Sequence, residues 1–127
     1  LLSTSRRQRQ MCIRDREVDE SKLSKSVMEA VKYMRKHYSE PISLESVSAE
    51  VHLKTDYLSR IFKEETGMNY SAFLAEIRLK KAAYLLNNTS ERVQEIGKAV
   101  GYPNVSYFST TFKKRFGLNP YEFRRKG

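Results

Sequence analysis

The sequence has few of the residues that build disulfides, metal sites and phosphate-binding loops. Its single cysteine, Cys12, cannot form an internal disulfide, and no group of Cys and His at metal-ligand spacing accompanies it. The two histidines, His37 and His52, are isolated, and the five glycines are dispersed and form no phosphate-cradling loop. Because no nucleophile and base can be paired either, we expect no enzyme activity, no metal site and no cofactor.

Long apolar runs are absent as well. No stretch of the sequence approaches the roughly 20 apolar residues that span a bilayer, and no apolar segment follows the basic N-terminus. We therefore expect neither a membrane anchor nor a signal peptide. A single cysteine also fits a reducing compartment, so the sequence predicts a soluble protein of the cytoplasm.

Acidic residues are in the minority. The 127 residues include 24 Lys and Arg against 15 Asp and Glu, which gives a formal net charge of +9. A chain of this length supports one compact domain with a modest core. Its charge suits a polyanionic partner, either nucleic acid or an acidic membrane surface.

The first residues do not read as part of this domain. Residues 1–20 contain five Arg and almost no periodic apolar residues, so we expect disorder there. The start of the chain, LLSTSRRQRQMCIRDR, resembles translated adapter sequence, and residues 1–16 are set aside as non-native. A basic arm that enters a DNA minor groove is the alternative. The following EVDESKLSK reads as a linker from a preceding domain, so tail and linker cover 1–23 and the domain covers 24–127.

Apolar residues recur at helical spacing from residue 23 onward and outline six helices. The first should end near His37. Ser43 can cap a short second helix, and Thr55 can cap a third. This third helix should stop at Gly67, because glycine takes the left-handed conformation at low cost.

A longer amphipathic helix is predicted from Asn69 to about Asn87, with its apolar residues along one side. A short fifth helix and a sixth follow, separated by a turn at 101–103. The residues expected on the apolar side of the long helix are Phe73, Ile77, Leu79, Ala82, Ala83 and Leu86. Those expected to point inward from the two later helices are Val93, Ile96, Val100, Phe108, Phe112 and Phe116.

Two segments of the chain repeat one pattern. IFKEETGMNY at 61–70 and TFKKRFGLNP at 111–120 share Phe, Lys, Gly and Asn at equal spacing. The preceding apolar residues also correspond, forty-nine residues apart instead of fifty, because the second turn is one residue longer. Each copy reads as a short helix, a turn, a longer helix and a glycine stop, which is a helix-turn-helix unit. The two units span about 43–67 and 92–117.

One face of the longer helix in each unit is predicted to meet DNA. Its polar residues follow i, i+3, i+4, i+7 spacing on the side opposite the buried residues. Arg suits a guanine edge, Ser and Thr can bond several bases, and Lys suits phosphate. The predicted base contacts are Asp56, Ser59, Arg60, Val105, Ser106, Ser109 and Thr110. The predicted phosphate contacts are Thr55, Lys63, Asn104, Lys113 and Lys114.

Basic residues are distributed unevenly between the two units. Residues 53–66 are neutral overall, whereas residues 104–127 carry six basic residues and one acidic residue, Glu122. We therefore expect the second unit to contribute more of the attraction to DNA that does not depend on sequence.

The region from Ile77 to the C-terminus carries a specific combination of residues. The combination is Arg78, Ala82, Leu85, Leu86, Ile96, Gly101, Tyr102, Tyr107, Phe108, Phe112, Lys113, Gly117 and Pro120. On this basis the chain from about Ser24 to Lys126 resembles the C-terminal domain of the AraC/XylS family of bacterial transcription regulators. Three residues depart from the family pattern: Gly97 replaces the usual Ala, Phe123 a frequent Tyr, and Thr110 a frequent Arg or Lys.

The resemblance implies an all-α fold of seven helices, with two helix-turn-helix units joined by a long central helix. It also implies sequence-specific binding to double-stranded promoter DNA, with RNA polymerase as a further candidate partner. The domain would bind DNA as a monomer, and a missing upstream domain could make the full regulator a dimer. A sensing or receiver domain would then precede this module.

Other functions stay open at this point. The chain could be a free-standing small regulator, or a helical protein-interaction module whose basic faces are only solvated. RNA binding is disfavoured, because the aromatic residues needed to stack bases are expected to lie in the core.

Overall fold

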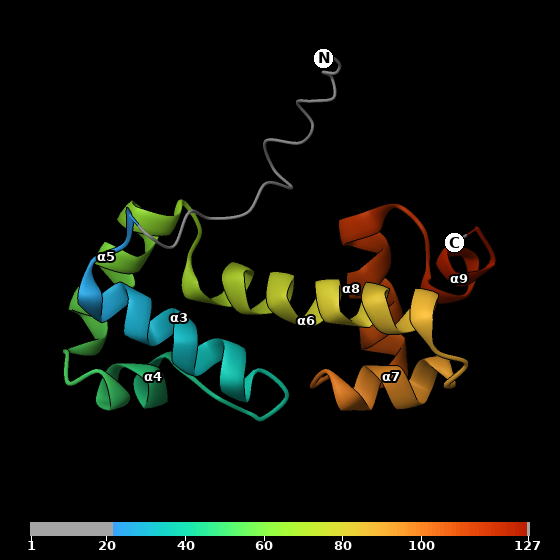
Figure 1. Cartoon of the computed structure of the whole chain (residues 1–127), viewed down its shortest axis with the longest axis horizontal. Helices are drawn as coiled ribbons and strands as arrows, with labels where there is room; N and C mark the ends of the chain where they lie inside the picture. Colours follow the sequence, from blue (N-terminus) through green and yellow to red (C-terminus); the bar gives the residue numbers. More distant parts are fainter. Residues whose placement is uncertain (1–21, 127) are drawn as a thin grey trace, which may run out of the picture.

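The computed structural model describes residues 22–126, and these form seven α-helices and no strand (Figure 1). The helices are α3 (Lys25–His37), α4 (Leu44–Glu50), α5 (Thr55–Thr66), α6 (Tyr70–Asn88), α7 (Val93–Ala99), α8 (Val105–Phe116) and α9 (Pro120–Lys126). The predicted all-α class is confirmed. The expectations for Cys12 and for the basic arm lie outside the described residues.

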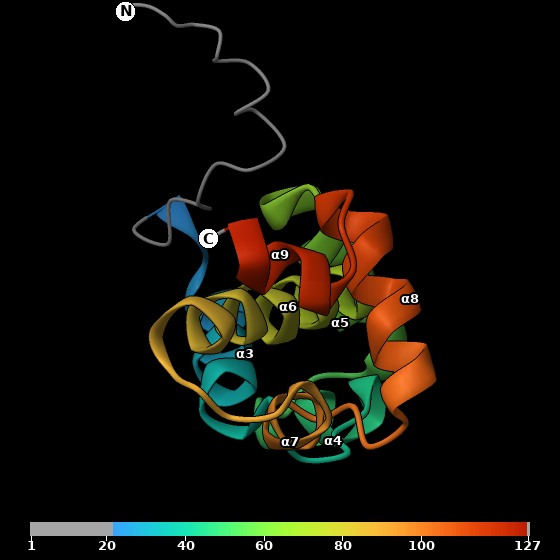
Figure 2. The same cartoon turned by 90° about the vertical axis from the view of Figure 1, so that its right-hand side faces the viewer.

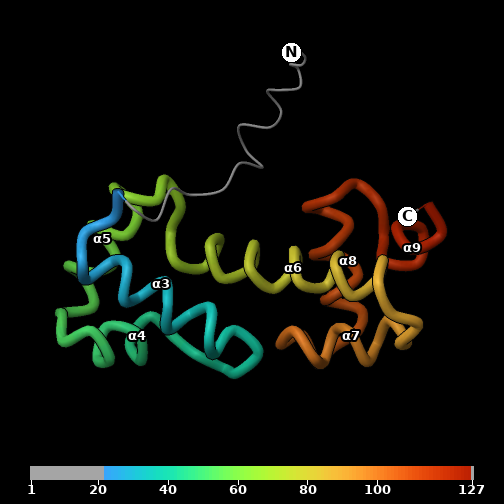
Figure 3. Tube along the Cα trace, viewed as in Figure 1, coloured from blue at the N-terminus to red at the C-terminus, as the bar shows by residue number. Residues whose placement is uncertain are grey.

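The helices form two groups joined by α6. In the Cα trace, α3, α4 and α5 gather at one end of α6, and α7, α8 and α9 gather at the other (Figure 3). Each group contains one helix-turn-helix unit, α4–α5 in the first and α7–α8 in the second. The architecture that the resemblance implies is therefore present.

Capping residues define most of the helix ends as predicted. The hydroxyl of Ser43 accepts a hydrogen bond from the backbone N–H of Ser46 at 3.1 Å at the start of α4. Gly67 has φ 80° and ends α5, since glycine adopts this conformation without a steric penalty. The side-chain oxygen of Asn69 accepts from the N–H of Ala72 at 2.8 Å and starts α6.

The prediction that Thr55 caps α5 is wrong. Lys54 occupies the N-cap position, makes no side-chain cap bond, and Thr55 is the first residue of the helix. The hydroxyl of Thr55 instead lies 3.0 Å from that of Ser48, which is the one buried polar residue in the described range. The Ser48 hydroxyl donates to the backbone oxygen of Glu45 at 3.0 Å, and Thr55 gives this buried hydroxyl a second hydrogen-bond partner across the turn.

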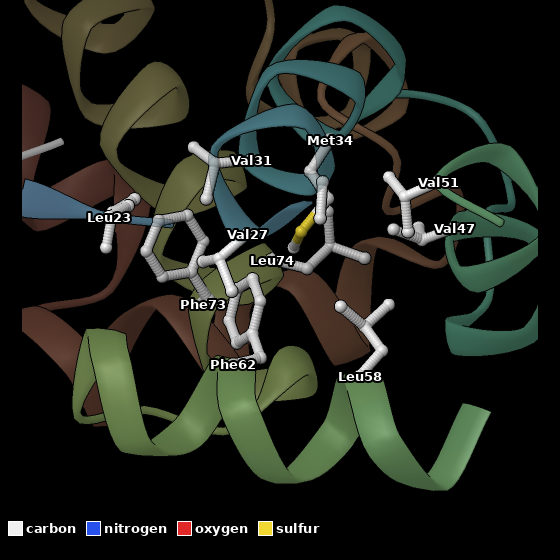
Figure 4. Close-up of a cluster of buried hydrophobic side chains, with 11 residues drawn as sticks. Leu23, Val27, Val31, Met34, Val47, Val51, Leu58, Phe62, Phe73 and Leu74 are labelled. Atoms are coloured by element: carbon white, nitrogen blue, oxygen red, sulfur yellow. The ribbon is translucent and has the colours of Figure 1, made fainter. Parts of the chain in front are cut away.

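The first group of helices has its own hydrophobic core. Figure 4 shows this cluster, in which side chains of α3, α4 and α5 meet Phe73 and Leu74 from the start of α6. The rings of Phe62 and Phe73 pack edge to face, with centroids 5.2 Å apart. The start of the long helix is therefore fixed to the first helix-turn-helix unit.

The second core contains a group of packed aromatic rings. Phe108 and Phe112 are fully buried, and Phe123 of α9 packs edge to face on Phe112 at 5.2 Å. Gly97 of α7 lies against this cluster, where an added Cβ would come within 2.9 Å of the Phe108 ring. Close packing thus explains why glycine occupies a helical position at which the related family usually has alanine.

The long helix α6 buries two different faces. Phe73 and Leu74 belong to the first core, whereas Leu79, Ala82 and Leu86 belong to the second. At 3.6 residues per turn, the two sets lie on nearly opposite sides of the helix. The prediction that the apolar residues of α6 lie along one side is therefore wrong. The helix nevertheless packs against both units, which it joins.

An ion pair fixes α8 to the middle of α6. Nε and Nη2 of Arg115 each lie 2.7 Å from a carboxylate oxygen of Glu76, and Nζ of Lys80 lies 3.6 Å from the same carboxylate. Burial raises the pKa of Glu76, but the hydrogen bonds and charge of Arg115, with help from Lys80, outweigh it and leave the pKa below its ordinary value. The charged carboxylate thus stabilises the fold.

Replacing Glu76 with glutamine should lower the free energy of unfolding at pH 7 by about 1–2 kcal/mol, because the hydrogen bonds to Arg115 lose their charge while the site keeps some solvent screening. The folded pKa is depressed, so this stabilisation is present above the unfolded value of about 4.3 and is lost as the pH falls below it.

Urea unfolding at pH 7 and near pH 3 tests this prediction. The difference in free energy of unfolding between wild type and Glu76→Gln should be smaller at the lower pH. Glu95→Gln is the matched control, because its pair with Lys98 is exposed and should contribute about 0.5 kcal/mol or less. An unchanged difference at both pH values would contradict the proposed role of the ionised Glu76.

Candidate nucleic-acid interface

The second helices of the two units, α5 and α8, lie on the same side of the molecule. Viewed along α6, both appear to the right of the long helix (Figure 2). Each buries two residues deeply, Leu58 and Phe62 in α5 and Phe108 and Phe112 in α8. The opposite face of each helix is exposed, so the structure presents two equivalent polar surfaces in one direction.

The exposed surface of α5 carries the residues predicted for the first unit. The exposed residues among them are Asp56, Ser59, Arg60 and Lys63. The guanidinium of Arg60 lies between two neighbours on the same helix: its Cζ is 5.1 Å from the ring centroid of Tyr57, and Nη1 is 3.6 Å from a carboxylate oxygen of Glu64. Both contacts are at the surface and hold Arg60 weakly, so the group can exchange them for a ligand.

The exposed surface of α8 carries the residues predicted for the second unit, with two exceptions. The exposed residues among those predicted are Ser106, Thr110, Lys113 and Lys114. Ser109 is half-buried, and Val105 is partly buried against the second core. Helical spacing did not predict this, because the burial of these two positions depends on how α8 packs against the rest of the domain.

Two of the predicted phosphate contacts already have structural roles. Asn104 caps α8, and its side-chain oxygen accepts from the N–H of Tyr107 at 2.9 Å. The hydroxyl of Thr55 is engaged with Ser48 as described above. Both residues still lie at the N-terminus of an exposed helix, where free backbone N–H groups favour an anion.

Charge is distributed unequally over the two halves of the described chain. Residues 22–69 carry eight basic and seven acidic residues, whereas residues 70–126 carry eleven basic and four acidic residues. The helix α8 ends in Lys113, Lys114 and Arg115, and α9 ends in three further basic residues. The second half therefore holds most of the positive charge of the domain.

Two exposed tyrosines on these surfaces were missed by the analysis of the sequence. Tyr57 of α5 and Tyr107 of α8 occupy equivalent positions in the two units, fifty residues apart, and are 45% and 60% exposed. The expectation that the aromatic residues lie in the core is therefore wrong for these two, and also for Tyr84 and Tyr121. The phenol hydroxyl allows tyrosine to remain at a surface, and the equal spacing was the signal that could have identified the pair.

Two other features are absent from the part of the chain that the structure describes. Between residues 22 and 126 no three His, Cys, Asp or Glu side chains gather in a way that could hold a metal ion. Within the same range, no helix is both long and apolar enough to cross a membrane.

Comparisons with known proteins agree with this reading. The sequence pattern of a helix-turn-helix domain matches residues 47–126. The xylose operon regulatory protein of Escherichia coli (strain K12) is 34% identical over 99 residues, which are 78% of this chain and 25% of that protein. The chain spans about a quarter to a third of the length of the curated relatives it matches.

Solved structures show the same fold. The C-terminal domain of AraT, a response regulator from Geobacillus stearothermophilus, superposes with a TM-score of 0.81 at 41% identity, over 84% of this chain and 88% of that one. The DNA-binding domain of AdpA, solved in complex with a target DNA, shares the fold at 22% identity with a TM-score of 0.77, over 81% of this chain and 93% of that one. Several of the curated relatives are named as transcriptional regulators or activators. The chain belongs to the AraC/XylS family of bacterial transcription regulators and carries its helix-turn-helix DNA-binding domain, whose pattern matches residues 47–126.

Proposed function

We propose that one copy of this domain binds promoter DNA by placing α5 and α8 in two successive major grooves on one face of the duplex. The observation that carries the proposal is the pair of exposed helices on one side of α6. With 19 residues, α6 is roughly 28 Å long at 1.5 Å per residue, close to the ~34 Å between successive major grooves.

The two units would contribute differently to recognition. In the first groove, Arg60 would pair with a guanine, flanked by contacts from Asp56 and Ser59. In the second groove the counterpart of Arg60 is Thr110, a shorter side chain that discriminates less between bases. The greater positive charge of the second half supports phosphate binding there, so one unit would mainly select sequence and the other mainly add affinity.

The domain would act as the output module of a longer regulator. The partial coverage of its relatives supports this, and an upstream domain could supply a signal and a dimer contact. In this setting the protein works in the cytoplasm, where it meets promoters and RNA polymerase. A free-standing regulator of this size is the alternative.

A binding titration of the 127-residue chain against a selected operator and random DNA, at several salt concentrations, tests the proposal. The logarithm of the association constant should fall linearly with the logarithm of the salt concentration. Phosphate contacts from Lys63, Lys113 and Lys114 alone predict a slope of about −2.7. A protein-interaction module instead predicts no measurable preference for the operator and no such slope, and that result would overturn the proposal.

A further inference from the structure

One arginine lies where the two cores meet. Arg78 is near the middle of α6, directly between Ile77, which packs against the first core, and Leu79, which is buried in the second. Its side chain is neither fully buried nor exposed. A residue at this position can contact both helix-turn-helix units.

The guanidinium of Arg78 is bonded to the first unit. Nε donates to the backbone oxygen of Tyr38 at 2.7 Å, and Nη2 donates to the backbone oxygen of Glu40 at 2.9 Å. Tyr38 is the C-cap of α3, so the positive group sits at the negative end of the helix dipole, where terminal carbonyls lack partners. The planar guanidinium donates to the two carbonyls from two different nitrogens held in a fixed geometry, whereas lysine has a single donor nitrogen on a flexible chain.

The same guanidinium is in contact with the second unit. Its Cζ lies 5.4 Å from the ring centroid of Tyr102, in the turn between α7 and α8. The neighbouring Gly101 lies so close to Arg78 and Tyr38 that an added Cβ would be 2.9 Å from Nε of Arg78 and 3.1 Å from the backbone oxygen of Tyr38. The end of α3, the arginine and this turn thus form one contact.

Tyr38 also contacts both units. It is partly buried and packs against both hydrophobic cores. The four residues Tyr38, Arg78, Gly101 and Tyr102 therefore join the two units at a point beside α6, in addition to the helix itself. Two points of attachment restrict rotation of one unit relative to the other more than a single helix does.

We propose that Arg78 is a positioning residue that fixes the distance and angle between α5 and α8, and thereby sets the spacing of DNA subsites that the domain accepts. The inference rests on the proposed two-groove binding. When one of two linked units is bound to DNA, the link keeps the other unit near its own subsite and so raises the overall affinity. A rigid link raises the affinity most at one spacing between the subsites. Variants of Arg78 that loosen the contact between the two units should bind less tightly at that spacing and should lose less affinity at other spacings.

The geometry can be tested without DNA. In a Cys12→Ser background, spin labels at Glu50→Cys and Ala99→Cys would report the distance between the ends of α4 and α7, both at exposed positions. The wild type should give one narrow distance distribution, and Arg78→Lys and Arg78→Met should broaden it by about twofold or more. Lys81→Met, which removes a charge from an exposed position of α6, is the control and should leave the width unchanged. Equal widths in folded Arg78 variants would overturn the proposal.

A series of operators with one or two base pairs added or removed between the subsites tests the consequence. For wild type and Lys81→Met, changing the spacing should lower the affinity by about tenfold or more. For Arg78→Lys, the same change in spacing should lower the affinity by less than about threefold. Affinity for an isolated subsite should be equal in all three proteins. Identical spacing profiles for wild type and Arg78→Lys would refute the role of Arg78. A wild type without any spacing preference would instead refute the two-groove binding itself, whatever the spin labels show.

Discussion

Replacing Arg60 with alanine is expected to weaken binding to a selected operator by about 1–3 kcal/mol and to relax the preference for one guanine. The Arg60 side chain is 59% exposed on the face of α5 that is turned away from the first core. A guanidinium can bond both O6 and N7 of guanine, and alanine leaves this base edge without a partner. Competition binding with operators changed at one base pair at a time would identify the guanine.

Lys113→Ala is the matched comparison, because Lys113 is exposed on α8 and is predicted to meet phosphate. It should weaken operator and random DNA similarly and flatten the salt slope by about one unit. If Arg60→Ala also lowers the affinity for operator and random DNA by the same factor, Arg60 does not read a base.

Replacing Gly101 with alanine is expected to lower the free energy of unfolding by about 2–5 kcal/mol. Gly101 has φ 106°, which an alanine adopts only with strain of about 1–2 kcal/mol. The added methyl group would also meet Nε of Arg78 at 2.9 Å and the oxygen of Tyr38 at 3.1 Å, and forcing atoms into a packed site costs about 1–3 kcal/mol more. Urea unfolding monitored by circular dichroism measures the loss.

Gly117→Ala separates the two contributions. Gly117 also has a positive φ, 83°, but an added Cβ there would meet nothing within 4 Å. Its replacement should therefore cost only the backbone strain, about 1–2 kcal/mol. Equal losses in Gly101→Ala and Gly117→Ala would show that the junction around Arg78 yields to the extra group and is not tightly packed.

Local signals predicted much of the fold. Ser43, Gly67 and Asn69 begin or end helices as their side chains and backbone preferences suggested, because these effects involve residues within one turn. The repeated sequence pattern predicted a short helix followed by a longer one at two places in the chain, and the structure has both pairs, α4–α5 and α7–α8. The error at Thr55 arose where a buried partner from the neighbouring helix, Ser48, took the hydroxyl that the local pattern assigned to capping.

Contacts between distant parts of the chain could not be predicted in this way. The single apolar side expected for α6 was an error of spacing, because at 3.6 residues per turn Phe73 and Leu74 lie nearly opposite the later apolar residues of the helix. Which unit each of the two sides packs against depends on tertiary contacts. The carbonyls that Arg78 binds lie 40 and 38 residues away in sequence. Of the candidate site, the exposed faces of α5 and α8 were predicted from helical spacing, whereas the partial burial of Val105 and Ser109 depends on how the elements pack. The individual DNA contacts stay predictions.

The two units repeat in the same chain order, so we expect one monomer to recognise two unequal subsites in a directional, non-palindromic operator. If α6 and the contacts of Arg78 hold α5 and α8 at one separation, as proposed above, both helices should meet the same face of the duplex.

The most direct test of this claim is to insert five base pairs between the two subsites of a selected operator and to measure the affinity of the 127-residue chain. The insertion rotates one groove by about half a turn relative to the other. The affinity should fall to that of a single subsite, while an insertion of about ten base pairs restores the face but lengthens the span and should not rescue binding. An operator with the five-base-pair insertion that binds as tightly as the original would contradict the binding of both helices by one rigid domain.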